Sequence, residues 1–190
     1  MSSNLQLVAS IVIAGIFLIG ILFFYGGVVD YSNEKMFQLH TQETTASLME
    51  IIDHDFRRIG SGLATPSVAI LDTSEITFLG DVDENGAVDT VRYYVSSLSD
   101  ANSTPNPNDV ILYRVVNGFN TIDTPAGVTN FEVTFLDESG LTTNDMMAVR
   151  ALHVNLRVES LYPYDNNYEI ANWEKRITPQ NLYRMTLTDY

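Results

Sequence analysis

The sequence predicts an α+β protein in which a long N-terminal helix packs on an antiparallel β-sheet domain. Three observations support this fold class. An uncharged apolar run occupies residues 7–29. Apolar residues spaced three or four apart follow over residues 48–59, which is the period of a helix. Beyond Pro66 apolar and polar residues alternate, which is the period of a strand.

These observations divide the chain of 190 residues into three parts. Residues 1–29 form the transmembrane half of the N-terminal helix. Residues 30–62 form its amphipathic half and a hinge, and residues 63–190 form an extracytoplasmic β domain. This length is sufficient for one ordinary domain and a membrane anchor.

The apolar run is predicted to be a retained membrane span. It contains no charged residue, and a helix needs about 20 apolar residues to cross the hydrocarbon core. A secretory signal peptide has a basic start and a shorter apolar core, whereas the first basic residue here is Lys35. A short tail before a large domain favours a cytoplasmic N-terminus. We therefore expect a single-pass inner-membrane protein with an exported C-terminal domain.

The helix is expected to continue past the membrane, since no proline precedes Pro66. Its second half carries an apolar stripe made of Leu48, Ile52, Phe56 and Ile59. Arg57 and Arg58 suit the negative end of the helix dipole, and Gly60-Ser61-Gly62 supplies a stop. The stripe needs a partner, which is either the chain's own sheet or neighbouring helices in a bundle. We expect its four residues to take part in assembly with other subunits.

Strands are predicted for most of the remaining chain. A first hairpin joins the segment of Ile76 and Phe78 to that of Val91, Tyr93 and Val95. Further strands are expected at 111–116, 128–136, 152–158 and 182–187, and turns at Asn117-Gly118 and 137–140.

Two polar segments, 97–109 and 161–172, are predicted to be exposed loops because they are rich in Ser, Asn, Pro and Asp. Aromatic residues crowd the end of the second loop; they are Tyr162, Tyr164, Tyr168 and Trp173. They are interpreted either as a clasp over the sheet edge or as an exposed contact patch.

The acidic composition limits the possible partners. The chain has 24 acidic against 10 basic residues and a formal net charge of −14, so it repels nucleic acid. It has no cysteine, which excludes disulfides and thiolate catalysis. The segment Asp53-His54-Asp55 is expected to be a solvated helix face, because adjacent helical residues diverge by about 100°. No nucleophile, base and oxyanion donor occur together in a known pattern, so we do not expect an enzyme.

Residues 81–89 resemble the first part of a calcium loop. Oxygen-bearing side chains stand at positions 1, 3, 5 and 9 and a glycine at position 6. The expected ligands are the side chains of Asp81, Asp83 and Asn85, the carbonyl of Ala87, and Asp89 directly or through water. Position 12, which needs a bidentate Glu, is Arg92, so Glu84 or a distant loop would have to replace it. The alternative is a polar hairpin turn without metal.

The chain resembles the type IV pilin superfamily, most closely the minor pilins and pseudopilins of the W and J type. The resemblance is carried by residues 51–60, by 76–78 leading into Tyr93-Tyr94, by 127–135 and by 149–158. It implies a filament subunit that assembles through its N-terminal helix with copies of itself or related subunits. Before assembly the helix would lie in membrane lipid, and the assembled filament would be extracellular or periplasmic. No cofactor would be required beyond possible calcium.

Two departures from that family concern the N-terminus. Family precursors are cut after a glycine that precedes the apolar run, usually behind a basic leader, whereas residues 1–5 here read Met-Ser-Ser-Asn-Leu, with neither feature. Family members also usually carry a glutamate at the fifth mature position. Here that position is Leu5 or Gln6, depending on whether Met1 or Ser2 is first. This favours a minor or tip-type subunit, or a lineage that assembles by packing alone.

Small residues in the span would let helices approach closely; they include Ala14, Gly15 and Gly20. Such residues are also common in membrane spans that do not associate. The competing function is therefore a single-pass membrane protein that never polymerises and presents its β domain to a ligand or partner.

Overall fold

A computed structural model describes residues 2–182, except 64–67, 102–103, 124–126, 165 and 180. Most of the strand expected at 182–187 lies outside the described residues. The chain divides into two compact units, an anchor unit (Met1–Leu39) and a β unit (His40–Tyr190). One helix, α1 (Ser2–Arg57), begins in the first unit and ends in the second.

The anchor unit is helical, and the apolar side chains of its membrane-span segment, residues 7–29, are largely exposed. They include Ile16, Phe23 and Phe24. Within the described part of the chain, α1 is the one helix long and apolar enough to cross a membrane. At about 1.5 Å per residue, residues 7–29 extend for roughly 35 Å, which exceeds the ~30 Å hydrocarbon core.

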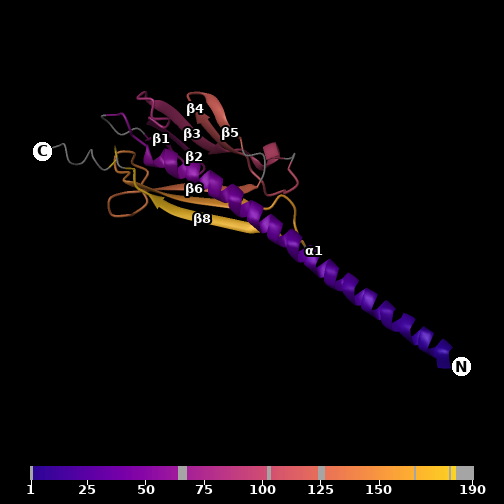
Figure 1. The fold of residues 1–190 in the computed structure, drawn as a ribbon. Coiled ribbons are helices and arrows are strands. Elements are labelled where there is room, and N and C mark those ends of the chain that lie inside the picture. The colour runs from indigo at the N-terminus through magenta and orange to yellow at the C-terminus, as the bar shows by residue number, and fades with distance from the viewer. Residues whose placement is uncertain are drawn as a thin grey trace. The chain divides into compact units, whose positions relative to one another are not determined.

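The β unit contains two antiparallel sheets (Figure 1). The first sheet has the order β1-β2-β3-β4-β5, with β1 (Val68–Leu71), β2 (Glu75–Gly80), β3 (Asp89–Val95), β4 (Leu112–Val116) and β5 (Phe119–Asp123). The second has the order β6-β7-β8, with β6 (Val128–Leu136), β7 (Ala151–Glu159) and β8 (Ile170–Ile177). A short 3-10 helix, η1 (Leu98–Ala101), follows β3. The α+β arrangement of a long N-terminal helix on antiparallel sheets is confirmed.

Several strands occur where the alternation of apolar and polar residues predicted them. The first hairpin pairs β2 with β3, with Ile76 opposite Tyr93 and Phe78 opposite Val91. Strand β6 has the bounds expected for it. In β7 the side chains of Leu152, Val154, Leu156 and Val158 are buried, and those between them are partly exposed.

The core of the β unit contains the C-terminal part of α1, which Figure 1 shows beside both sheets. The stripe residues Leu48, Ile52, Phe56 and Ile59 are exposed by only 7, 1, 0 and 0 %. The ring of Phe56 meets those of Phe78 and Tyr93 edge to face, with centroids 5.7 and 5.4 Å apart. Such aromatic contacts add to the stabilisation from burial.

This burial corrects the assembly role expected for the stripe. Of its two possible partners, the structure selects the chain's own sheets. Leu48, Ile52, Phe56 and Ile59 are therefore core residues and are not a surface for a second subunit.

The end of α1 approaches β2 so closely that only glycine fits. A Cβ on Gly80 would lie 2.3 Å from the backbone oxygen of Arg58. The amide of Gly60, which has a positive φ of 79°, donates to the oxygen of Leu79 at 2.8 Å. The glycines around this contact therefore fix where α1 ends against the first sheet.

The second polar segment is not a loop throughout. Its last residues begin β8, where Trp173 pairs with Leu156 and packs partly buried against the core. Trp173 therefore belongs to the edge strand of the second sheet and not to a loop, which corrects its predicted position. Strands β1 and β5 were not predicted from the sequence either.

The first polar segment is also less exposed than expected. Ala101, Asn106 and Asp109 are all buried. The amide nitrogen Nδ2 of Asn106 donates to Oε2 of Glu159 at 3.1 Å, which attaches the segment to the end of β7. A polar residue in this segment is therefore buried because a long-range hydrogen bond satisfies it.

Candidate functional site

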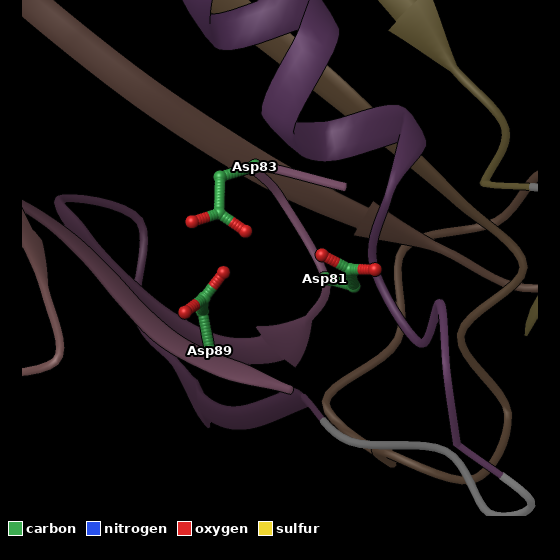
Figure 2. A group of neighbouring side chains, drawn as sticks. All are labelled: Asp81, Asp83 and Asp89. Carbon is green, nitrogen blue, oxygen red and sulfur yellow. The ribbon is translucent and has the colours of Figure 1, made fainter. Parts of the chain in front are cut away.

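The candidate metal site is the turn between β2 and β3. Asp81 and Asp83 lie in the turn, and Asp89 is the first residue of β3. One carboxylate oxygen from each of the three lies within 4.8 Å of the others. Figure 2 shows the carboxylates of Asp83 and Asp89 facing one another, with that of Asp81 to one side. The fold thus brings together three of the five predicted ligands.

Hydrogen bonds inside the turn hold two of these carboxylates. Asp81 accepts the backbone N–H groups of Asn85, at 3.1 Å, and Gly86, at 3.0 Å. Asp83 accepts both the backbone and the side-chain N–H of Asn85, at 3.2 and 2.9 Å. The Asn85 side-chain oxygen accepts the N–H of Ala87 at 2.7 Å. Aspartate and asparagine favour turns through such bonds.

Asp89 differs from the other two because it is buried, with 4 % of its surface exposed. Its Oδ1 accepts Nδ2 of Asn117 at 2.7 Å, and its Oδ2 accepts the N–H of Val82 at 3.2 Å. Asn117 precedes β5 in the turn after β4, so Asp89 links two neighbouring hairpins. This side chain therefore stabilises the first sheet whether or not an ion binds.

The twelfth position of the calcium pattern does not contribute a ligand. Arg92 lies in β3 and forms a paired contact with Glu75 of β2, at 2.9 and 3.1 Å. The proposed replacement, Glu84, forms an ion pair with Arg58 at the end of α1. Calcium takes six to eight oxygen ligands, so three carboxylates would leave most of its shell to water. The arrangement is suited to weak cation binding.

Sequence reasoning missed the buried ion pair of the β unit. Asp55 is 1 % exposed and accepts two hydrogen bonds from Arg114, at 2.6 and 3.1 Å, and one from the Tyr93 hydroxyl at 2.6 Å. Burial, followed by the charge of Asp55, raises the pKa of Tyr93 well above its ordinary value.

The expected solvated face of Asp53-His54-Asp55 is therefore wrong for Asp55. Helical spacing contained the signal, because Asp55 lies three residues after Ile52 and four before Ile59, on the buried face. Asp53 contacts a different partner, Lys175 of β8, at 2.8 Å. The two carboxylates diverge, as the helix geometry predicted, but each binds a cation of a different sheet.

The small residues of the span lie in the anchor unit. An added Cβ on Gly15 or Gly20 would meet no other atom within 4 Å, so nothing in the described chain covers them. Around Gly20 the helix surface has an apolar hollow of about 330 Å³, bordered by Ile16, Phe17, Ile21 and Phe24. Ala14, which precedes Gly15 in the same half of α1, is also exposed.

No protein-family model, curated protein or solved structure matches this chain.

Proposed function

We propose that this chain is a structural subunit of a type IV pilus-like or pseudopilus filament, with a minor or tip-type position favoured. The observation that carries the proposal is the unbroken helix α1. Its first half presents uncovered apolar side chains, and its second half belongs to the core of a folded β unit. In such a subunit the apolar half lies in membrane lipid before assembly and packs against other subunits afterwards.

The uncovered surface around Gly20 supports packing between helices. A residue without a side chain lets a second helix approach closely, and large apolar neighbours such as Phe17 and Phe24 can enter the matching hollow of that helix. The partners would be copies of this chain or related subunits, not nucleic acid. This proposal assigns the chain no catalytic activity and no required cofactor.

A second candidate function is favoured by the burial of the apolar stripe. Because Leu48, Ile52, Phe56 and Ile59 are covered by the chain's own sheets, the β unit needs no second subunit to complete its core. A β unit that folds without a second subunit is what a single-pass membrane protein needs if it never polymerises and presents this unit to a ligand. The two candidates differ in what contacts the apolar half of α1.

Cysteine cross-linking in whole cells distinguishes the candidates, since the chain has no native cysteine. The double variant Ala9→Cys/Ile16→Cys places two thiols seven residues apart, on one face of α1. After oxidation, a filament subunit gives a long ladder on a denaturing gel, and a minor subunit gives one or two discrete bands. Monomer alone overturns the filament proposal and leaves the membrane-tethered module.

Two controls make the result specific. Each single variant, Ala9→Cys or Ile16→Cys, can form no product larger than a dimer. The variant Asn144→Cys places a thiol on an exposed loop residue of the β unit and measures random collision. A filament subunit must also occur in material sheared from cells, whereas a tethered module stays in the membrane fraction.

A further inference from the structure

A polar hollow of about 510 Å³ lies on one face of the β6-β7-β8 sheet. Its lining residues on β7 are Asn155, Arg157 and Glu159, which alternate with the core residues Leu156 and Val158. Because successive side chains of a strand point to opposite faces, the hollow lies on the face away from the core. This face plays no part in the filament proposal.

The strand register sets the lining side chains in rows. Asn130, Arg157 and Asn172 lie opposite one another on β6, β7 and β8. The next row places Asn155 opposite Glu174. Directly opposed residues lie about 5 Å apart at Cβ, so the amides and charged groups of these rows are close enough to contact one ligand together.

Buried contacts hold part of this lining in place. Glu159 is only 6 % exposed, and its Oε1 lies 2.8 Å from the guanidinium nitrogen Nη2 of Arg157, with which it forms an ion pair. Its Oε2 accepts Nδ2 of Asn106 at 3.1 Å. The side chain of Asn108, which also lines the hollow, lies 3.5 Å from the same oxygen. A ligand would therefore meet groups that are already oriented, which lowers the entropy cost of binding.

The chemistry of the lining indicates the class of ligand. Every lining residue is polar, and half of them are asparagines: Asn108, Asn130, Asn155 and Asn172. An amide side chain both donates and accepts hydrogen bonds, as does each hydroxyl group of a sugar. The Arg157 charge is neutralised by Glu159, and the net charge of −14 on the chain repels anionic ligands.

We propose that the hollow over Asn130, Asn155, Arg157 and Asn172 binds a neutral polyhydroxylated ligand of the saccharide class. Its volume lies within the ~300–1,000 Å³ of ordinary ligand sites. The amides of Asn155 and Asn172 bind hydroxyl groups, and Arg157, fixed by Glu159, donates to a ring or hydroxyl oxygen. The site is independent of whether the chain forms filaments.

The test uses the full chain in a zwitterionic detergent, because a detergent with a sugar headgroup would compete for the site. An array of immobilised neutral and anionic oligosaccharides is screened first. The free form of the strongest neutral binder is then titrated by calorimetry. We expect saturable binding that Asn155→Ala and Asn172→Ala each weaken about ten-fold, through the loss of hydrogen bonds to the ligand.

The matched control is Asn144→Ala, which removes an exposed amide outside the hollow and should bind as the unchanged chain does. The thermal unfolding midpoint of each variant verifies that it is folded. The proposal is overturned if no neutral oligosaccharide binds, if only anionic ones bind, or if the Asn155 and Asn172 variants bind as tightly as the control.

Discussion

Asp55 occupies a position where the loss of a single charge should be costly. Its carboxylate lies in the core, where Arg114 and the Tyr93 hydroxyl satisfy it. An ion pair of this kind is not by itself strongly stabilising, because both charges had to leave water. Removing one partner is different, since the other charge then stays buried without compensation.

We therefore expect Asp55→Asn to lower the free energy of unfolding by about 3–5 kcal/mol. The control is Asp53→Asn, whose carboxylate is more accessible and should cost about 1 kcal/mol or less. Urea unfolding of the full chain in detergent, followed by the fluorescence of Trp173, measures both. Equal losses of unfolding free energy in the two variants would contradict the conclusion that Asp55, and not Asp53, is the buried carboxylate.

Asp109 should make stability depend on pH in the opposite sense to most carboxylates. Burial raises the pKa of this carboxyl above its ordinary value, with the nearby charge of Glu159 adding to it, although the neighbouring Thr104 hydroxyl and Gly127 backbone offset part of the rise. Between the ordinary and the raised pKa the folded state holds a proton that the unfolded state has lost. The contribution of Asp109 to stability therefore falls as pH rises through this window.

The variant Asp109→Asn should consequently be more stable than the unchanged chain at pH 7. This advantage should shrink as the pH approaches and passes below 3.8, where both side chains are neutral. Thermal unfolding midpoints measured between pH 3 and pH 7 follow the difference. Asp145→Asn, at an exposed loop carboxylate, is the control, and a constant difference across the pH range would refute the expectation.

The turn between β2 and β3 also contacts the residues that follow α1. The N–H of Asp81 donates to Oγ of Ser61 at 2.8 Å, and NH1 of Arg58 donates to the oxygen of Asp81 at 3.1 Å. Arg58 also pairs with Glu84 in the same turn. The guanidinium thus lies beside the carboxylates that would hold an ion, which limits how strongly a cation could bind.

The calcium hypothesis makes a prediction about this turn. Calcium that binds the folded state and not the unfolded state raises the unfolding midpoint, by an amount that grows with concentration above its dissociation constant. We expect a rise only at millimolar calcium, because three protein carboxylates leave the shell incomplete. Asp83→Asn should abolish the rise and Asp145→Asn should not. An unchanged midpoint in the parent chain would identify a turn without metal.

The strands differ in how well they could be predicted from the sequence. Strands β6 and β7 were predictable because one face is buried and the other wet, which produces clear alternation. Strand β8 was not, because its inward positions include Lys175, whose charge pairs with Asp53 of the distant helix. Strands β1 and β5 are short edge strands whose pairing depends on their neighbours.

At the candidate metal site, too, one part could be predicted from the sequence and another part could not. The local spacing of Asp81, Asp83 and Asp89 was visible in the sequence, and the three do converge. The hydrogen bonds that hold Asp81 and Asp83 come from Asn85 and Gly86 in the same turn, and were therefore also open to prediction. Asp89 is different, because it also accepts a hydrogen bond from Asn117, which lies far away in the sequence. A tertiary partner of this kind has no local signature, so the burial of Asp89 beneath a second hairpin could not be predicted.

At the scale of the whole molecule, the C-terminal part of α1 is the element that both sheets share. Asp55 contacts Arg114 of the first sheet, and Asp53 contacts Lys175 of the second. The stripe between Leu48 and Ile59 fills the core between these contacts. Without this helix, the apolar faces of both sheets would be open to water.

A fragment that begins at His40 should therefore fold, whereas one that begins at residue 63 should not. The first retains every residue of the β unit, and the second loses the buried stripe together with Asp53 and Asp55. Near-ultraviolet circular dichroism and cooperative urea unfolding distinguish the two. A cooperative transition in the shorter fragment would show that the sheets form their core without α1.

The continuity of α1 also has a mechanical consequence. Tension applied to residues 7–29 passes along a single hydrogen-bonded helix into the buried segment that holds Phe56 and Asp55. In a protein joined to its anchor by a flexible linker, the linker would stretch before the folded part bore any load. Because α1 is continuous and its end belongs to the hydrophobic core, we expect that pulling the helix free disrupts the core of the β unit.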